Sequence, residues 1–151
     1  RNTNSYGPGD PHIDHIIAGS MVSLLRNERP VIRSDGSPTK AYLYSQDTME
    51  AYMLLARNIS NIGVKGEAFN VTANKPVTVL NLVNMIVEVS GKPELSPIVE
   101  FTDLSQQGTV EHLSDTKIRE SLGWTPKFSL EDGLIRTYRW YEEHGVDQWL
   151  R

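Results

Sequence analysis

The stretch from Pro30 to Asp47 constrains the fold most, because two short apolar runs flank a dense cluster of turn residues. Residues 34–38 read Ser-Asp-Gly-Ser-Pro, and these types favour turns through local hydrogen bonds, a positive φ or a fixed φ. We therefore predict two strands, Val31–Arg33 and Lys40–Ser45, that fold back on each other as a hairpin.

Such a hairpin would bring Arg33 and Lys40 to the same end, beside Tyr42 and Tyr44. Guanidinium and ammonium groups form charge-assisted hydrogen bonds with phosphate oxygens, and aromatic rings pack on flat or apolar ligand faces. The combination suits a diphosphate with an attached ring. The alternative is a surface hairpin with two solvated cations and two core tyrosines, and the spacing alone leaves both interpretations open.

Composition excludes several classes of function. With 151 residues, 38% hydrophobic and 23% charged, the chain has the size and content of one globular domain. A net charge of −4 without a long basic run argues against nucleic-acid binding. The absence of cysteine excludes disulfides and thiolate metal sites. Since no apolar run approaches the ~18 residues of a membrane span, we expect a soluble, cytoplasmic protein with no membrane partner.

Apolar residues at helical spacing predict five helices between short strands. The first begins at the cap Asp10 and reaches about Asn27, and the second begins at Ser45 with a buried face. The third is capped by Thr78 and ends at Gly91. The buried face predicted for the helix that begins at Ser45 consists of Met49, Tyr52, Met53, Ala56 and Ile59. We also predict strands at 68–73 and 97–101 and a loop at 102–109. A short helix follows Ser114 and ends at Gly123, and a last helix runs from Ser129 to about His144.

His12, Asp14 and His15 allow a metal-site interpretation, because imidazole and carboxylate groups ligate zinc and positions three apart share a helix face. A metal hydrolase built on these residues is one hypothesis. A catalytic zinc site needs about three protein ligands, and His112 and His144 lie far away in sequence. The preferred interpretation is therefore ordinary polar residues at a helix start, with no metal.

Several motifs together resemble one family. Residues 1–10 carry R-x-x-N-x-Y-G-P-G-D, residues 117–126 carry K-x-x-x-x-L-G-W-x-P, and residues 136–141 carry R-T-x-x-W-Y. These strings resemble nucleotide-sugar epimerases and dehydratases of the extended short-chain dehydrogenase/reductase family, and the likeness covers essentially the whole chain. The string I-R-S-D-G at 32–36 is most similar to CDP-glucose 4,6-dehydratases.

Two features of that family are absent from the sequence. A Gly-rich loop between strand and helix holds the pyrophosphate of NAD(P) in such enzymes, and a Tyr-x-x-x-Lys pair supplies the acid or base. Neither pattern occurs here. In the family both lie upstream of the R-x-x-N-x-Y-G-P motif. The resemblance therefore implies a mixed α/β domain, residues 1–151, that is the C-terminal substrate-binding part of a longer enzyme, without a cofactor of its own.

The resemblance also implies site residues. Asn4 matches the family asparagine that hydrogen-bonds the nucleotide sugar, and Ile16 and Ile17 match the pair that packs around the base. Arg33 borders the nucleotide, and Lys40 stands where the family has an arginine that pairs with the diphosphate. Lys40 keeps the charge but not the bidentate geometry, and Ala41 replaces an acidic residue. The family's R-P-x-D/H segment has no clear counterpart in residues 102–109.

Two functional hypotheses follow. In the first, the chain binds a nucleotide-diphosphate sugar for an NAD- or NADP-dependent epimerase or dehydratase whose cofactor domain is missing here. In the second, it is a non-catalytic interaction or scaffold module that has kept the fold, and the Lys40 and Ala41 replacements favour this alternative. A strand at 68–73 that lacks its neighbour in the sheet would be covered by the remainder of the protein or by a second copy in a homodimer.

Overall fold

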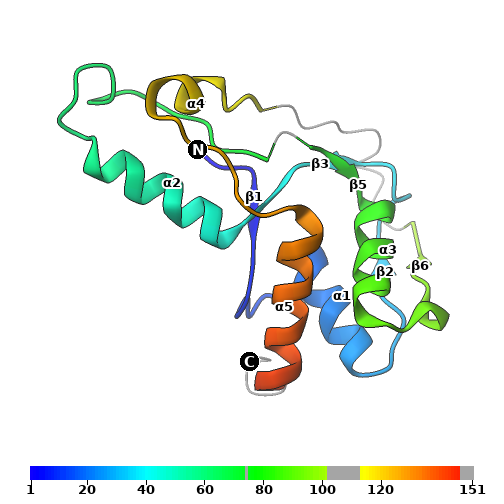
Figure 1. Ribbon diagram of the computed structural model, residues 1–151. Helices are drawn as coiled ribbons and strands as arrows, with labels where there is room; N and C mark the ends of the chain where they lie inside the picture. Colours follow the sequence, from blue (N-terminus) through cyan, green and yellow to red (C-terminus); the bar gives the residue numbers. More distant parts are fainter. Residues whose placement is uncertain (74, 102–112, 147–151) are drawn as a thin grey trace.

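The computed structural model describes residues 1–73, 75–101 and 113–146. Within these ranges lie five α-helices, six short strands and a 3-10 turn (Figure 1), which confirms the predicted mixed α/β class. The predicted loop at 102–109 and His112 lie outside the described residues. In chain order the elements are β1 Asn4–Tyr6, α1 Ile16–Leu25, β2 Val31–Ile32, β3 Thr39–Lys40, β4 Tyr42–Tyr44, α2 Ser45–Arg57, β5 Val77–Thr78, α3 Val79–Ser90, η1 Pro93–Leu95, β6 Ile98–Val99, α4 Thr116–Leu122 and α5 Leu130–His144.

The predicted helix ends are confirmed for α3 and α5. The Thr78 hydroxyl accepts the Asn81 N–H at 3.2 Å, and Gly91 ends α3 in the left-handed conformation. The Ser129 hydroxyl accepts the Asp132 N–H at 3.0 Å. Each cap satisfies a backbone donor that the first helical turn leaves without a partner, so the local sequence alone determines these boundaries.

Helices α1, α3 and α5 pack together and form what we call the helix lobe, at the lower right of Figure 1. Gly133 lets α5 approach β1 closely, because a Cβ there would collide with the Tyr6 hydroxyl. The core of the lobe is formed by side chains from all three helices and from β1 and β4. Burial of their apolar surface is the main source of the lobe's stability. Its buried members are Tyr6, Ile17, Ala18, Met21, Leu24, Tyr42, Tyr44, Leu82, Ile86, Val87, Leu134, Tyr138 and Tyr141.

The predicted hairpin is wrong. Strand β2 pairs in parallel with β6, β3 pairs antiparallel with β5, and β4 pairs in parallel with β1. The turn residues do not return the chain on itself, because they bind the start of α3: Gly36 and Pro38 accept the backbone N–H groups of Leu80 and Val79 at 3.1 and 2.9 Å. Tertiary contacts with α3 therefore outweigh local pairing.

Strands β4 and β1 form a small parallel sheet that separates two cores. Because side chains alternate along a strand, Tyr42 and Tyr44 enter the helix lobe while Leu43 points to the other side. There it joins a second cluster with α2, α4 and residues 64–71. The strand predicted at 68–73 is reduced to a bridge between Val71 and Asn2.

The first helix begins later than predicted. Asp10 caps a turn, since its Oδ1 accepts the His12 N–H at 3.0 Å, and α1 begins only at Ile16. Gly19 makes this possible, because a Cβ there would collide with the carbonyl oxygen of Ile13. The turn at 11–15 consequently folds against α1 and places its polar side chains beside the helix.

The predicted buried face of α2 is also wrong. Its inward residues are Asp47, Thr48 and Ala51. The predicted face points outward, with exposed fractions of 60% for Met49 and 46% for Met53. Figure 1 shows α2 at the upper left, apart from the helix lobe. Among the helices of the described segments, none is both long and apolar enough to cross a bilayer.

Candidate ligand-binding pocket

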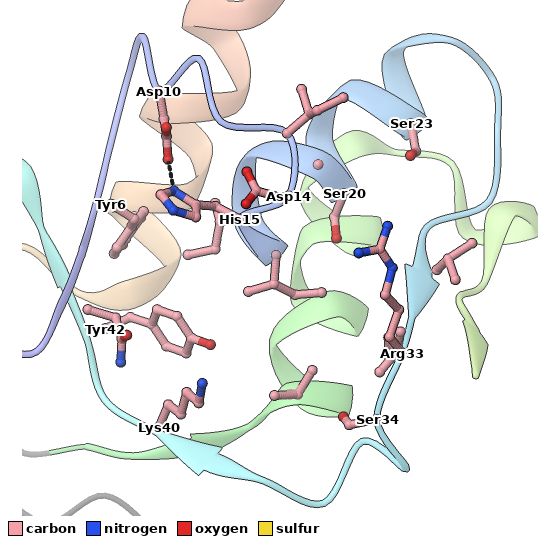
Figure 2. Close-up of a pocket in the computed structure, with 18 of the residues that line it drawn as sticks. Tyr6, Asp10, Asp14, His15, Ser20, Ser23, Arg33, Ser34, Lys40 and Tyr42 are labelled. Atoms are coloured by element: carbon pink, nitrogen blue, oxygen red, sulfur yellow. Dashed lines mark hydrogen bonds and ion pairs between the residues drawn. The ribbon is translucent and has the colours of Figure 1, made fainter. Parts of the chain in front are cut away.

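A cavity of about 790 Å³ lies between β1, the turn before α1, α1 itself, and strands β2 to β4. Its size falls within the roughly 300–1,000 Å³ of typical ligand pockets. Figure 2 shows that its walls differ in chemistry, with basic side chains on one part and acidic, imidazole and hydroxyl groups on another. The lining residues used below are Asn4, Tyr6, Asp10, Asp14, His15, Ile16, Ile17, Ser20, Ser23, Arg33, Ser34, Lys40, Tyr42 and Val79.

The basic part of the lining comes from two strands that do not pair with each other. Arg33 directly follows β2, whose position is set by its pairing with β6. Lys40 lies in β3, opposite Val77 of β5. In Figure 2 the guanidinium group and the ammonium group point into the same cavity from different walls. Both cations line this cavity although the hairpin that was predicted to bring them together does not form.

Asn4, Ile16 and Ile17 line the same cavity, so all five predicted site residues are brought together. The Asn4 side-chain amide donates to the carbonyl oxygen of Ala41 at 3.1 Å, which fixes it against the chain between β3 and β4. Ile17 is buried and Ile16 is half-buried, and they supply apolar surface at the start of α1. Their contact with a ligand stays a prediction.

The opposite wall is formed by the turn at 11–15 and by α1. Asp10 Oδ2 lies 2.8 Å from His15 Nδ1, and Asp14 points into the cavity beside them (Figure 2). A carboxylate that accepts Nδ1–H leaves the other imidazole nitrogen as an acceptor in the neutral ring. Ser20 adds a hydroxyl group one turn further along the helix. This wall can therefore hydrogen-bond hydroxyl or N–H groups of a ligand.

The metal-site interpretation gains no support from the geometry. Across residues 1–73, 75–101 and 113–146, no three histidine, cysteine or carboxylate side chains are arranged to hold a metal ion. His15 is engaged by Asp10, and the rings of His12 and His15 lie 5.1 Å apart. His144 instead stacks on Trp140 in α5.

The buried tyrosines near the pocket are hydrogen-bond donors rather than bases. Burial raises the pKa of Tyr6 well above its usual range, and its hydroxyl donates to the carbonyl oxygen of Leu130 at 3.0 Å. Burial likewise raises the pKa of Tyr141 to about 12, and its hydroxyl donates to the Asp10 carbonyl oxygen at 2.7 Å. Both hydroxyls are thus bonded to backbone carbonyl oxygens, and the raised pKa disfavours the phenolate form that would act as a base.

Sequence reasoning missed Ser20, Ser23, Ser34 and Val79 as lining residues. A signal existed for the two serines of α1, because positions 16, 20 and 23 share one helix face and only the first is apolar. No comparable signal existed for Val79, which reaches the cavity because α3 packs beside β2. Proximity in the fold, not local sequence, gives it this position.

Comparisons with known proteins identify several similar enzymes. Residues 1–72 match the NAD dependent epimerase/dehydratase family. GDP-L-fucose synthase 1 from Arabidopsis thaliana is 32% identical over 92% of the chain, and dTDP-D-glucose 4,6-dehydratase from Bos taurus is 26% identical over 95%. Over most of its length the chain is thus similar to nucleotide-sugar enzymes, and residues 1–72 match the NAD dependent epimerase/dehydratase family model.

Solved structures support the same fold. UDP-glucose 4-epimerase from Thermotoga maritima, solved with UDP-glucose, is 28% identical over 95% of the chain with a TM-score of 0.79. dTDP-glucose 4,6-dehydratase from Streptomyces venezuelae, solved with NAD, covers 100% of the chain with a TM-score of 0.82, and its 24% identity supports the fold alone. The chain spans less than half the length of these proteins, between 40% and 45%.

The described residues do not fit a dinucleotide cofactor of the kind that family members hold on a glycine loop. Helices α2 and α3 begin directly after a strand, and neither junction contains glycine. The glycines after β1 face protein atoms: a Cβ on Gly7 would collide with the Ser45 side chain, and one on Gly9 would lie 3.5 Å from the Trp140 ring. The side of each glycine that a Cβ would occupy therefore faces protein: the Ser45 side chain at Gly7 and the Trp140 ring at Gly9.

Proposed function

We propose that residues 1–151 form the nucleotide-sugar-binding domain of an NAD(P)-dependent epimerase or dehydratase. The observation that carries this proposal is the convergence of Arg33 and Lys40 on one cavity that also contains Asn4, Ile16 and Ile17. The match of residues 1–72 to the epimerase/dehydratase family model supports it, as do relatives whose names include GDP-, dTDP- and UDP-sugars. The particular nucleotide stays open, and the likeness to CDP-glucose dehydratases stays a prediction.

The role of the pocket in this proposal is binding and orientation. Arg33 and Lys40 neutralise the diphosphate, the isoleucines of α1 pack on a flat group, and the Asp10–His15 wall takes hydroxyl or N–H groups. Fixing a sugar relative to a cofactor removes much of the entropic cost of bringing the reactants together. The cofactor, NAD or NADP, supplies oxidation at the sugar and hydride return, and it is held by a domain outside the described residues.

The test is calorimetric titration of the chain with UDP-glucose, dTDP-glucose, GDP-mannose and CDP-glucose. We expect one of these to bind, and Arg33→Ala or Lys40→Ala to weaken binding roughly tenfold or more, as loss of a charge-assisted contact does. Lys65→Ala is the matched control, because Lys65 is an exposed cation away from the cavity. The ligand affinity should also fall as the salt concentration rises, because the contacts are ionic.

The same titration separates the proposal from the scaffold alternative. A scaffold module predicts no heat with any of the four nucleotide sugars and no effect of Arg33→Ala on thermal stability in their presence. Equal affinity of the Arg33, Lys40 and Lys65 variants would place the ligand elsewhere and contradict the proposal.

A further inference from the structure

A second cavity, of about 460 Å³, lies between α3 and α5 and shares no lining residue with the first. We call it the α3–α5 pocket. Figure 1 shows the two helices side by side in the helix lobe, where they pack against each other. The volume falls within the roughly 300–1,000 Å³ of typical ligand pockets. The helix lobe therefore carries a candidate site that is separate from the nucleotide-sugar pocket.

Part of the lining of the α3–α5 pocket is apolar. Met85 and Val89 lie one turn apart on the same face of α3, and Ile135 adds a third apolar side chain from α5. All three side chains are half-buried. Burying their remaining apolar surface under a ligand is favourable, so this part of the pocket suits an aliphatic chain.

The exposed side chains of the α3–α5 pocket are mainly acidic. Glu88, Glu131 and Glu142 contribute three carboxylates against the one guanidinium group of Arg139, which gives the lining a net charge of −2. In the described parts of the chain, none of these carboxylates forms an ion pair or a side-chain hydrogen bond. Glu131 and Glu142 lie about 16 Å apart along the axis of α5. The pocket is therefore acidic at widely separated points.

A buried hydroxyl group in the same pocket is an independent observation. Tyr138 lines the pocket with only 3% of its surface exposed, and its hydroxyl has no hydrogen-bond partner among the residues that the structure describes. On the same helix, the Tyr141 hydroxyl does have one. Buried polar groups are normally hydrogen-bonded. Burial and the charge of Glu142 raise the pKa of Tyr138, so its neutral oxygen and the Glu142 carboxylate can both accept from a cationic N–H donor.

We propose that the α3–α5 pocket binds a linear aliphatic polyamine. Its ammonium groups donate to the separated carboxylates and to the Tyr138 hydroxyl, and its methylene segments pack on the apolar side chains of α3 and α5. A metal ion fits less well, because no three carboxylate or imidazole groups in residues 1–73, 75–101 and 113–146 are arranged to hold one. An anionic ligand is repelled by the net negative charge of the lining.

The test is calorimetric titration of the 151-residue chain with spermine and with putrescine. We expect spermine to bind at least about tenfold more tightly, because putrescine is too short to reach both acidic ends. Glu142→Gln should weaken spermine binding roughly tenfold. The matched control is Glu143→Gln, because Glu143 is the adjacent exposed carboxylate and does not line the pocket. Tyr138→Phe keeps the buried ring but removes the hydroxyl, and it should also weaken binding roughly tenfold.

Arg139→Gln provides a change of the opposite sign. The substitution removes a positive charge from the lining, so the affinity for spermine should rise about two- to fivefold. A substitution that only disturbed the fold would weaken binding instead. Because Arg139 and Glu142 are exposed, their variants decide the question even if Tyr138→Phe fails to fold.

Other results would overturn the proposal. Equal losses of spermine affinity in Glu142→Gln and Glu143→Gln would make spermine a nonspecific counterion of an acidic protein. Equal affinities for spermine and putrescine, or displacement of spermine by an equal concentration of magnesium chloride, would have the same meaning. No heat with spermine, or a folded Tyr138→Phe variant with unchanged affinity, would contradict the site itself. Since the two pockets share no lining residue, failure to bind nucleotide sugars would overturn only the proposed function.

Discussion

Helices α2 and α5 are both amphipathic, yet they turn opposite sides to the solvent. Helix α5 buries Leu134, Tyr138 and Tyr141, and its outward residues are charged: Glu131, Asp132, Arg136, Arg139 and Glu142. Helix α2 buries Asp47 and Thr48 and exposes an apolar stripe that includes Met49, Tyr52 and Met53. The periodicity of a helix thus shows which face is apolar, but not whether the chain buries that face. The helix lobe buries the apolar faces of its helices within the described residues, whereas α2 leaves large apolar side chains exposed.

The largest expected effect comes from replacing two methionines, one on a buried helix face and one on an exposed helix face. Met21 is fully buried in the helix lobe, and Met53 is 46% exposed on α2. Met21→Ala should lower the free energy of unfolding by about 2–5 kcal/mol, since it leaves a cavity, and Met53→Ala by less than about 0.5 kcal/mol. Urea unfolding of the chain measures both. Equal losses would mean that the stripe is already covered in the chain, and repeating the measurement at several concentrations would detect self-association as the cause.

The next effect tests what attaches α2 to the helix lobe. Asp47→Ala leaves the backbone N–H groups of Lys127 and Phe128 without their acceptor, and we expect a loss of about 1.5–3 kcal/mol in urea unfolding. Asp47→Asn keeps one acceptor oxygen and is the matched control, with a smaller loss. If both variants are as stable as the parent chain, the link between α2 and the start of α5 is not structural.

A third prediction concerns the approach of β1 to α5. Alanine normally favours a helix over glycine, but a Cβ at position 133 would collide with the Tyr6 hydroxyl. Gly133→Ala should therefore destabilise the chain by about 1–3 kcal/mol. In a Tyr6→Phe background, where the hydroxyl is absent, the same substitution should cost less. A thermal-unfolding double-mutant cycle measures the difference, and additivity would disprove the close approach.

The smallest effect is a pH dependence on the α2 side. Lys117 donates to Glu67 at 2.7 Å, and this contact lowers the pKa of Glu67 below its usual value. A carboxyl group with a depressed folded pKa stabilises the protein above its unfolded pKa, and that stability is lost as the pH falls through the folded pKa. Lys117→Gln should thus reduce stability slightly at about pH 6 and change nothing below both pKa values. Urea midpoints across this range test it, and a loss that persists in acid would point to packing on Phe69 instead.

The local sequence determined the elements whose stabilising contacts lie within a few residues. Thr78, Gly91, Ser129 and Gly123 mark helix ends through their own hydrogen bonds or backbone conformation, and all four predictions are confirmed. The turn chemistry of residues 34–38 is also real, since Asp35 Oδ1 accepts the Ser37 N–H at 2.9 Å. The five candidate site residues were named from the resemblance to the family motif, and all five line one cavity, while their contact with a ligand stays a prediction.

The tertiary structure alone decided which segments meet. Strands β2, β3 and β4 follow one another in sequence, but each pairs with a distant partner. The turn at residues 34–38 is instead hydrogen-bonded to the first residues of α3. Arg33 and Lys40 therefore share a cavity through the packing of α1, α3 and three separate strand pairs, not through a hairpin. The direction in which α2 faces was decided in the same way, since burying one carboxylate with two backbone donors fixed the helix and left its apolar stripe outward.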